Sequence, residues 1–456
     1  MLRRKVYDEL VAWRGRPDRR PLLVCGPRQV GKTTIIRHFA AENYDNVLEF
    51  DLGEDREVHR VFDGNLYPDT IIRGLSLFTD PDRLVPGSTL VFLDEIQECP
   101  RARTALRHLA NDRRFDLIAS CPLSGADLPG KGDCVPGRPS IIGPEERLVM
   151  HGLDFEEFLW AMKVDKGTID YVRGCIRDTE PIDEAVLSRF GSLFRDHMIV
   201  GGMPEAVRSF RDTGGYTEPN RIKDRIIGTW IADMDRCNRG ADRVKTVDCF
   251  RSIPTQLSQS NKKFMYSRVG GDGSRRSAER YMRNLLWIEA AGYGDMCRML
   301  ESPEPPLRGM ERRDRFKLHL PDTGLLMNMY GPNAMRAIYS KGLSFNMGAV
   351  AENVVAECLR KNGIRPTSYR KNNGPGMMEL DFVFENTTGV TVLEVKSGKS
   401  RDAPSVRKAS MFPQVNRRIV LAGGNVSAAP DGIVNLPLFA AAFIRETDPP
   451  WDGPEF

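Results

Sequence analysis

Residues 21–41, "PLLVCGPRQVGKTTIIRHFAA", decide the fold of the first part of this chain. Pro21 to Cys25 is a short apolar run that suits a buried strand, and Thr34 to Ala41 reads as a helix. Between them, Gly26 to Thr33 matches the phosphate-loop pattern G-x-x-x-x-G-K-[ST]. Glycines let such a loop curl so that its backbone N–H groups, at the start of a helix, surround phosphate oxygens. The order strand, loop, helix therefore predicts a P-loop nucleotide site.

Each part of this loop has an expected role. Lys32 would reach the β- and γ-phosphates, and the Thr33 hydroxyl would ligate Mg²⁺. The residues expected to contact the nucleotide are Gly26, Pro27, Arg28, Gln29, Val30, Gly31, Lys32, Thr33 and Thr34. The alternative is a glycine-rich turn with an exposed lysine, which the flanking strand and helix disfavour.

A second element, "STLVFLDEIQECP" at residues 88–100, supports the same site. Its continuous apolar run, Leu90 to Leu93, is typical of a buried parallel strand, and ligands bind at the carboxyl ends of such strands. Asp94 would hold Mg²⁺, and Glu95 is placed to orient or deprotonate the water that attacks the γ-phosphate. Alone, two acids after an apolar run usually mark a strand that meets solvent. Behind a phosphate loop they predict a hydrolytic site.

The neighbouring segments predict the rest of the core. "NVLEFDL" (46–52) and "FDLIAS" (115–120) read as strands, and "RARTALRHLAND" (101–112) reads as a helix. This alternation favours an α/β fold with a parallel sheet and helices on both faces. An acid directly after the metal-binding aspartate favours an ATPase over a small-molecule kinase, so we expect ATP and Mg²⁺ as cofactors.

Composition sets broader limits on the chain. Its 456 residues suggest two or three domains, and a formal net charge of only +4 means that any nucleic-acid contact must come from local patches. The nine cysteines are scattered and never spaced C-x-x-C, which argues against a disulfide framework and against a zinc site. The amino terminus lacks the apolar core of a signal peptide, and the longest apolar stretch is too short and broken to span a bilayer. We therefore expect a soluble cytoplasmic protein with no membrane contact.

Six segments taken together resemble a known family. They are "GPRQVGKTT" (26–34), "LVFLDEIQECP" (90–100), "LDFEEFLWAM" (153–162), "GGMPEAV" (201–207), "FKLHLPDTGLL" (316–326) and "ELDFVFENTTGVTVLEVKSGK" (379–399). In content and order they are similar to prokaryotic AAA-type ATPases that carry a C-terminal domain of unknown function related to restriction endonucleases. The resemblance covers nearly the whole chain. It implies an ATP-binding core in the first half and a nuclease-like fold at the end, with no cellular role assigned.

One departure from the family pattern concerns the γ-phosphate sensor. After the strand 115–120 the family tends to carry Gly-Ser, whereas this chain has Cys121-Pro122, with Ser124 slightly later. Proline offers no N–H donor, so we expect slow hydrolysis. Arg138 and Arg147 are candidates for an arginine that stabilises charge in the transition state. The alternative for each is a solvated surface arginine.

The segment 379–399 poses an electrostatic question. It reads as a hairpin with a turn at Asn386 to Gly389, which pairs Glu385 with Val390 and Val383 with Val392. The same register sets Asp381 opposite Glu394, and like charges directly across a strand pair are destabilising unless something positive lies between them. Lys396 projects from the same face as Glu394.

Two answers to that question remain open. A preceding amphipathic helix, 345–363, carries Glu352 at the edge of its apolar stripe, and helix Glu, strand Asp and then Glu-x-Lys is the order of the PD-(D/E)xK nuclease core. Asp381 and Glu394 would then hold a second divalent cation, Mg²⁺ or Mn²⁺, with Glu352 reaching over the hairpin, and Lys396 would activate water or stabilise developing phosphate charge. In the alternative, Lys396 bridges the two acids and no metal binds.

The middle of the chain predicts helices followed by a short hairpin, the order of a winged helix. On a helical projection of 275–288, Arg276, Arg280, Arg283 and Trp287 gather opposite an apolar face. A basic face with an aromatic suits phosphate contacts in a DNA groove. An ordinary solvated helix face, or a protein-interaction module, explains it equally well.

The sequence thus predicts five regions and two functional hypotheses. The regions are a P-loop ATPase domain (1–164), a helical connection (165–240), a winged-helix-like region (241–340), a nuclease-like α/β domain (341–445) and a disordered tail (446–456). In the first hypothesis an ATPase controls a DNA-directed nuclease. In the second, ATP orders a binding switch that recognises DNA or protein without cutting. A protein partner or a second copy of the chain is open in both.

Overall fold

The structure is a computed structural model, and it describes residues 1–123, 145–238, 240–259, 262–270, 278–339, 346–371 and 377–447. The chain divides into two compact units. The first unit comprises Met1–Gly152, Asp233–Thr246 and Met282–Tyr293, and the second comprises Leu153–Ala232, Val247–Tyr281 and Gly294–Phe456. Two segments from the middle of the chain therefore belong to the first unit. The domain limits inferred from the sequence remain predictions.

The first unit is built on a five-stranded parallel sheet with the order β2-β3-β4-β1-β5. Its strands are β1 (Leu22–Cys25), β2 (Asn46–Asp51), β3 (Thr89–Asp94), β4 (Asp116–Cys121) and β5 (Glu146–Val149). Every residue of β1 and β3 is buried, which explains why β1 and the Leu90–Leu93 run of β3 are continuously apolar rather than alternating. The predicted parallel sheet is confirmed.

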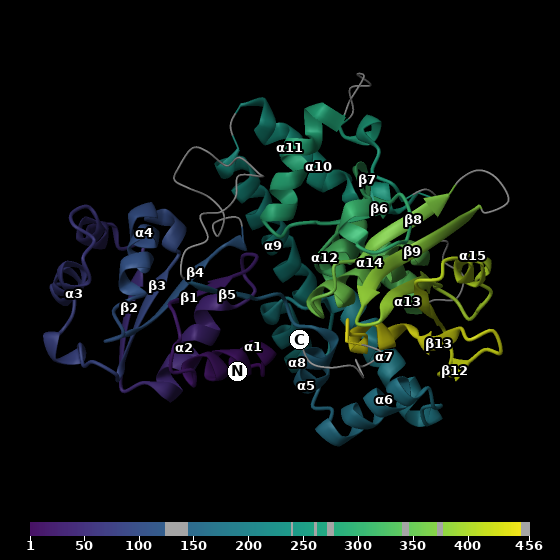
Figure 1. Cartoon of the computed structure of the whole chain (residues 1–456), viewed down its shortest axis with the longest axis horizontal. Helices are drawn as coiled ribbons and strands as arrows, with labels where there is room; N and C mark the ends of the chain where they lie inside the picture. Colours follow the sequence, from purple (N-terminus) through teal and green to yellow (C-terminus); the bar gives the residue numbers. More distant parts are fainter. Residues whose placement is uncertain are drawn as a thin grey trace. The chain divides into compact units, whose positions relative to one another are not determined.

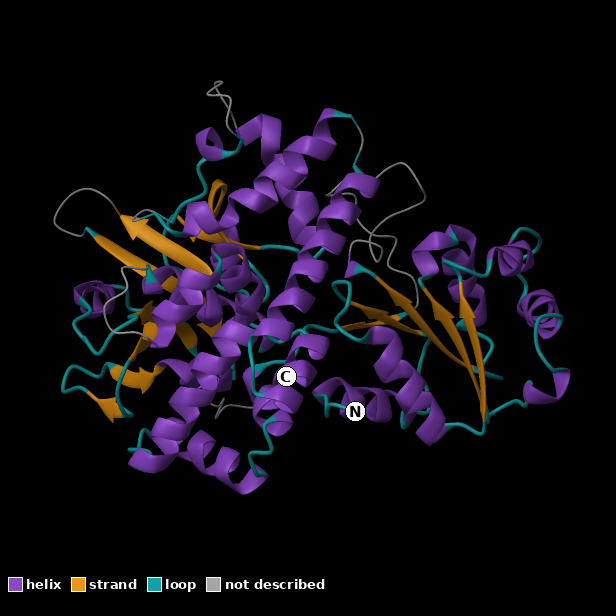
Figure 2. Ribbon diagram, turned by 180° about the vertical axis from the view of Figure 1, so that it is seen from behind, coloured by secondary structure: helices purple, strands orange, loops and turns teal. Residues whose placement is uncertain are grey.

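Helices cover both faces of this sheet, as Figures 1 and 2 show. They are α1 (Lys5–Arg14), α2 (Lys32–Asn43), α3 (Pro68–Ser76) and α4 (Pro100–Leu109). The small and aliphatic residues of α4, such as Ala102, Ala105 and Leu106, share one core with alternate strand residues, such as Leu23 and Leu93. Because consecutive strand residues point to opposite faces, the remaining strand residues face the other helix layer.

The middle of the chain is helical. Its helices are α5 (Phe155–Ala161), α6 (Lys166–Asp178), α7 (Glu184–Val200), α8 (Pro204–Thr213), α9 (Thr217–Cys237), α10 (Ala241–Leu257) and α11 (Ala278–Ala290). The start of α5 shows how local sequence sets these limits. The Asp154 side chain accepts the Glu157 N–H while the Glu157 side chain accepts the Asp154 N–H, which is a capping box.

The second unit contains an eight-stranded mixed sheet with the order β12-β13-β11-β10-β9-β8-β6-β7. Its strands are β6 (Asp295–Leu300), β7 (Glu311–His319), β8 (Thr367–Lys371), β9 (Met378–Asn386), β10 (Gly389–Val395), β11 (Val415–Ala422), β12 (Ser427–Ala428) and β13 (Val434–Pro437). Its later helices are α12 (Thr323–Tyr330), α13 (Pro332–Tyr339), α14 (Met347–Lys361) and α15 (Pro404–Lys408). Strands β10, β11 and β13 run parallel, so their carboxyl ends meet at one edge.

The hairpin that follows α10 and α11 is not a separate wing. Strands β6 and β7 pair antiparallel, as the predicted order of helices and then a hairpin requires. However, β6 also pairs with β8, so this hairpin forms one end of the eight-stranded sheet. The winged-helix assignment remains a prediction.

Three broader expectations can be compared with the described ranges. None of the helices found there combines the length and apolar character that a membrane crossing needs. No disulfide joins the cysteines that the structure describes, although the Cys25 and Cys121 sulfurs, at the paired ends of β1 and β4, lie 3.3 Å apart. The predicted tail lies outside the described residues from position 448 onward.

Candidate functional site

The phosphate loop connects β1 directly to α2. Gly31, the residue before the helix, has φ 91°, a left-handed conformation that glycine adopts without strain. At Gly26 the reason for glycine is space, because a Cβ would lie 2.2 Å from the Met150 carbonyl oxygen. The chain can therefore curl at both ends of the turn, as the sequence pattern predicts.

Lys32 lies inside the curl of the loop. Only 6% of Lys32 is exposed to solvent, and its Nζ donates to the carbonyl oxygens of Gly26 and Pro27, each at 3.0 Å. Burial lowers the pKa of Lys32, and the nearby carboxylate of Glu95 opposes that shift. The ammonium thus lies in a shielded position, where the charge of a phosphate would complete its environment.

Asp94 and Thr33 meet at the carboxyl end of β3. The Thr33 hydroxyl donates to Asp94 Oδ2 at 2.7 Å, and the Ser120 hydroxyl donates to the other Asp94 oxygen. A hydroxyl and a carboxylate supply the hard oxygen ligands that Mg²⁺ prefers. The donor set of Thr33 and Asp94 therefore fits the magnesium ion that an ATP site requires.

Glu95 is held beside this pair by several contacts. It adopts φ 51°, a left-handed conformation that is unusual for a residue with a side chain. Its N–H lies 3.3 Å from Ser120 Oγ, and Gln97 Nε2 donates to Glu95 Oε2 at 2.6 Å. The Arg28 guanidinium lies 3.7 Å from the same oxygen. The turn after β3 therefore fixes a carboxylate next to the candidate metal ligands.

Ser120 was missed by sequence reasoning, which looked for a polar residue at Cys121, Pro122 or Ser124. The structure instead brings the hydroxyl of Ser120, fully buried at the end of β4, onto Asp94 and Glu95. Pro122 therefore does not leave the end of this strand without a polar group. A single hydroxyl near the end of a buried, mostly apolar strand is the signal that could have found it.

Of the two candidate arginines, the structure describes only Arg147. Arg147 is an exposed residue within β5, where its Cα pairs with Leu23 rather than with the strand end that carries the loop. Arg138 lies outside the described residues. The proposed role of either arginine in hydrolysis remains a prediction.

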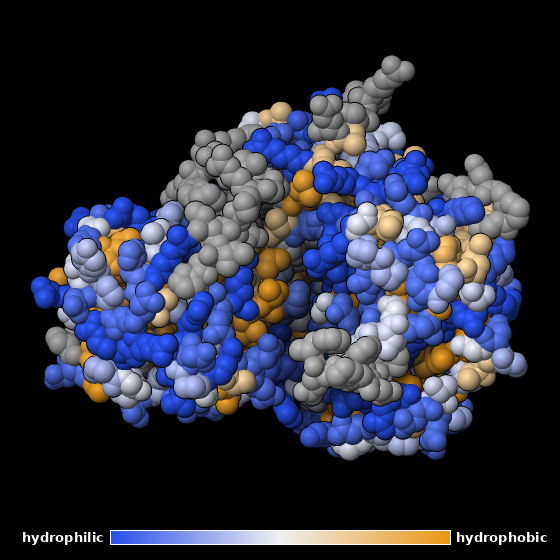
Figure 3. Space-filling view, viewed as in Figure 1, coloured by the Kyte–Doolittle hydropathy of each residue, from blue (hydrophilic) through white to orange (hydrophobic). Residues whose placement is uncertain are grey.

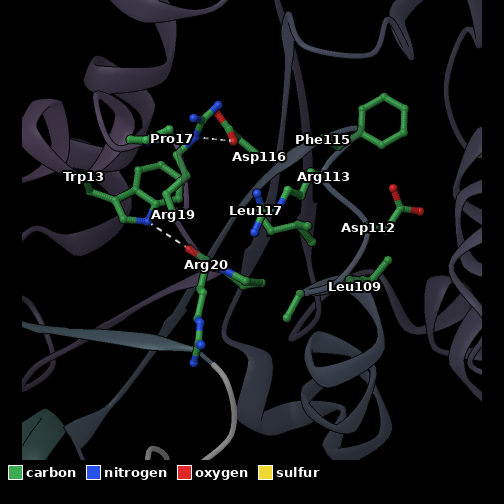
Figure 4. Close-up of a pocket in the computed structure, with 12 residues that line it drawn as sticks. Trp13, Pro17, Arg19, Arg20, Leu109, Asp112, Arg113, Phe115, Asp116 and Leu117 are labelled. Atoms are coloured by element: carbon green, nitrogen blue, oxygen red, sulfur yellow. Dashed lines mark hydrogen bonds and ion pairs between the residues drawn. The ribbon is translucent and has the colours of Figure 1, made fainter.

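A small pocket in the first unit is separate from the nucleotide site. It lies at the amino ends of β1 and β4, beside Trp13, Arg20 and Asp116, and Figure 4 shows Arg19 pairing with Asp116 at 2.7 Å there. Its volume is about 110 Å³, well below the few hundred Å³ of a typical ligand pocket. The phosphate loop follows the opposite end of β1, so this pocket does not belong to it.

The C-terminal hairpin has the predicted register. Val390 pairs with Glu385 and Val392 with Val383, and the paired register ends at Leu393 with Phe382. The next step of that register sets Glu394 against Asp381, whose Oδ2 accepts the Val395 N–H at 2.9 Å. Burial and the neighbouring Asp381 raise the pKa of Glu394 to about 7. The like-charge opposition expected from the sequence is therefore real.

The positive partner of Asp381 is a residue that the sequence reasoning missed. Lys317 on β7 has a side chain only 4% exposed, and its Nζ lies 2.8 Å from Glu352 Oε1 and 3.5 Å from Asp381 Oδ1. Lys262 contacts the other oxygen of Glu352. The two lysines hold the pKa of Glu352 well below its usual range, although burial opposes this. A lysine between buried apolar residues of β7 is the signal that could have revealed it.

Lys396 pairs with a different carboxylate from the two that Lys317 contacts. Its Nζ lies 2.8 Å from Glu394 Oε1, as a salt-bridged arrangement requires. The three carboxylates of Glu352, Asp381 and Glu394 thus face three ammonium groups, and we call these six side chains the lysine–carboxylate cluster. Within the described residues, no group of three or more His, Cys, Asp or Glu side chains is arranged to hold a metal ion. The cluster fits a divalent cation poorly, because Lys317, the Val395 N–H and Lys396 already contact three of the four carboxylate oxygens of Asp381 and Glu394.

Lys396 also borders a larger cavity of the second unit. This cavity measures about 290 Å³ and lies at the carboxyl ends of β10, β11 and β13. Its lining is mostly apolar, with Phe194, Met198 and Leu438 among its residues, and its cations are Arg195 and Lys396. Ligands commonly bind at the carboxyl ends of parallel strands, so the cavity is a candidate binding site.

The candidate DNA-contact helix keeps its described arginines exposed but buries its aromatic residue. Arg280 and Arg283 are exposed on α11, whereas Arg276 lies outside the described residues. Trp287 is 4% exposed, and its ring packs against Tyr293 with 6.0 Å between centroids. Tertiary packing therefore buries the aromatic residue that was expected beside the arginines, and Arg280 and Arg283 are the predicted contact residues that are exposed in the described part of the helix.

Comparison with known families agrees with this geometry. Residues 18–159 match an AAA domain, residues 191–336 match a domain of unknown function, DUF8612, and residues 347–439 match another, DUF4143. The first part of the chain is therefore a Walker-type AAA ATPase domain, and the later domains have no assigned function. No protein of curated function matches the chain.

Similar solved structures add only weak fold similarity. A Walker-type ATPase of Pyrococcus abyssi is 13% identical with a TM-score of 0.41, over 72% of this chain and 96% of that one. The RuvB Holliday junction branch migration motor of Thermotoga maritima is 13% identical with a TM-score of 0.29, over 69% and 92%. PCH-2 of Caenorhabditis elegans is 14% identical with a TM-score of 0.23, over 63% and 66%. Similarity at this level carries no argument about function.

Proposed function

We propose that this chain is a magnesium-dependent ATP hydrolase whose nucleotide state controls a binding domain in its C-terminal part. The observation that supports hydrolysis is the hydrogen-bonded series Thr33–Asp94–Ser120, with Glu95 directly beside it. A site that only bound nucleotide would not need a second carboxylate there. Glu95 is within the first turn after β3, where a general base for the attacking water belongs.

The side chains divide the work as follows. Backbone N–H groups of the phosphate loop surround the phosphates, and Lys32 supplies the compact positive charge. Thr33 and Asp94 would hold Mg²⁺, which would supply charge neutralisation at the phosphate oxygens. Glu95 accepts a proton from water, and Gln97 fixes the orientation of its carboxylate through the bond to Oε2. Ser120 occupies the place of the polar sensor at the end of β4.

Two substitutions separate binding from hydrolysis. We expect Lys32→Ala to abolish MgATP binding, because the loop loses its only buried ammonium within the described residues. We expect Glu95→Gln to bind ATP normally and to lose turnover, since an amide cannot accept the proton of water. Nucleotide titration and phosphate release measure the two effects. The controls are the exposed Lys166→Ala and Glu54→Gln, which should match the wild type. Wild-type turnover in Glu95→Gln would assign the base elsewhere.

For the C-terminal domain we propose binding without cleavage. The competing hypothesis is a PD-(D/E)xK nuclease, in which Asp381 and Glu394, with Glu352, would hold a second cation and Lys396 would activate water. The specific observation against it is Lys317, whose ammonium lies between Glu352 and Asp381. A cation held by Asp381 and Glu394 would have to share Asp381 with the ammonium of Lys317.

Divalent ions distinguish the two hypotheses in the full chain. Plasmid DNA should stay intact with Mg²⁺ or Mn²⁺, with and without ATP, in the wild type and in Lys396→Ala. Since Mn²⁺ also binds beside ATP, thermal unfolding is measured without nucleotide in the Lys32→Ala background. Mn²⁺ should leave that melting temperature unchanged. Cleavage that Lys396→Ala removes, or Mn²⁺ stabilisation that Asp381→Asn and Glu394→Gln both remove, would establish the nuclease instead.

A further inference from the structure

Arg28, in the phosphate loop, faces two carboxylates within the first unit. Its Nη2 lies 3.7 Å from Glu95 Oε2, and its Nε contacts Asp233 on α9. The three side chains are 23%, 25% and 13% exposed, respectively. They are therefore partly shielded from water, where charges interact more strongly than they do in fully exposed surface pairs.

Asp233 is itself held firmly in place. The Tyr293 hydroxyl donates to Asp233 Oδ2 at 2.8 Å, and Arg236 lies 3.5 Å from the other oxygen. The residue before Tyr293, Gly292, packs on the loop so closely that a Cβ would lie 3.1 Å from Pro27 Cγ. Segments far from the loop in sequence thus form part of its surroundings. Among the groups they contribute, the Asp233 carboxylate contacts Arg28.

A bound nucleotide brings a third anion to this guanidinium. Glu95 must lie close to the terminal phosphate if it is to activate water there, and Arg28 lies next to Glu95. A guanidinium presents five donors in a planar fork that matches phosphate oxygens, and a terminal phosphate carries more negative charge than a single carboxylate. The phosphate is therefore a competitor for the place of Asp233.

We propose that Arg28 exchanges Asp233 for the terminal phosphate of ATP, and that it thereby couples the nucleotide to helix α9. This inference rests on the ATP site proposed above and assigns its regulation. Arg28 acts here as a phosphate-binding residue, and its contact with Glu95 also depends on which anion it holds. Asp233 lies near the end of α9, and the residues of α9 up to Ala232 belong to the second unit. Release of Asp233 would thus remove a contact from the end of a helix whose residues belong to both units.

The coupling has a signature that a merely structural role lacks. ADP has no γ-phosphate to compete for Arg28, so Asp233 should weaken ATP binding and leave ADP binding unchanged. Asp233→Asn keeps the shape of the side chain and removes its charge. We expect it to lower the Kd for ATP about fivefold or more, which is the usual lower range of coupling between two sites, with the Kd for ADP unchanged.

A double-mutant cycle on the full-length chain tests this exchange. In the Arg28→Gln background, Asp233→Asn should no longer change the Kd for ATP, because the shared partner is gone. The matched control is Asp235→Asn, two residues further along α9, where the carboxylate pairs with Arg243 at 2.7 Å. It should leave both nucleotide affinities at their wild-type values.

Three outcomes would overturn the inference. They are an unchanged Kd for ATP in Asp233→Asn, an equal change with Arg28→Gln present, and an equal change for ADP. The first needs only one conservative variant, so the test survives if Arg28→Gln fails to fold. Failure of the ATP site itself gives a different result, namely normal ATP binding in Lys32→Ala. If Lys32→Ala abolishes binding and Asp233→Asn has no effect, the site stands and the exchange does not.

Discussion

The surroundings of Glu394 favour its protonated form in the folded chain. Burial, and then the neighbouring Asp381, raise its pKa from an ordinary 4.5 to about 7, although Lys396 opposes the shift. Because the folded state binds this proton more tightly than the unfolded state does, stability falls as the pH rises from about 4.5 through 7. Above that window the full unfavourable contribution is present, and below it the contribution disappears.

Glu394→Gln should remove this contribution. We expect the variant to gain roughly 1–3 kcal/mol in the free energy of unfolding at pH 8 and to match the wild type near pH 4.5. Urea titrations at the two pH values measure it, with Glu301→Gln, an acid that is 64% exposed, as the control. A loss of stability at pH 8 would show that the negative charge of Glu394 is needed, as it would be for a bound cation.

Lys317 connects three elements of the second unit. It lies on β7 and pairs with Glu352 on α14 and Asp381 on β9. Lys317→Met would leave two buried carboxylates with less positive charge, and we expect a loss of about 3–5 kcal/mol in stability. Adding Glu352→Gln should recover part of that loss, because a neutral amide at position 352 does not need the positive charge of Lys317.

Chemical denaturation of the two variants measures both effects, and Lys371→Met on the exposed end of β8 serves as the control. If the double variant were less stable than Lys317→Met alone, the Glu352 charge would stabilise the fold through Lys262 rather than through Lys317.

The elements that the sequence predicted well are those whose information is local. The phosphate loop lies between a strand and a helix within about twenty residues, and its glycines are required by the backbone itself. The hairpin register follows from its turn and from strict alternation. The missed groups depend on contacts between distant segments. Ser120 meets Asp94 from another strand, and Arg28 meets Asp233, over two hundred positions away. No local periodicity encodes such pairs.

Across the whole chain, positive and negative formal charges nearly balance, with 66 Lys and Arg residues against 62 Asp and Glu. The formal net charge is +4, and Figure 3 shows a mostly hydrophilic face with small apolar patches. A global field is therefore too weak to drive DNA binding, and any such binding depends on a few side chains. The exposed arginines of α11, Arg280 and Arg283, are the described candidates.

For any binding of DNA by this chain, the salt dependence of the affinity should therefore follow the number of phosphate contacts. Each phosphate contact contributes about 0.9 to the slope of log affinity against log salt, so Arg280→Gln with Arg283→Gln should lower that slope by about 2. Fluorescence anisotropy with a labelled duplex measures it, with the exposed Arg189→Gln as the control. The proposed switch also requires the affinity to differ between ATP and ADP. An unchanged slope would assign the helix to a protein partner.

Because Lys317 is buried, the rate at which it is acylated reports how often the second unit opens around it. Acylating reagents attack only an unprotonated, accessible amine, whereas the Lys317 side chain is 4% exposed and Glu352 and Asp381 hold its pKa above the usual range, although burial opposes this. Lys399, on an exposed loop of the same unit, reacts as soon as reagent is present. Lys317 reacts only when the sheet opens around it. The ratio of the two acylation rates, measured for each peptide by mass spectrometry, therefore gives the rate of that opening in the intact chain. No label has to be built into the protein beforehand.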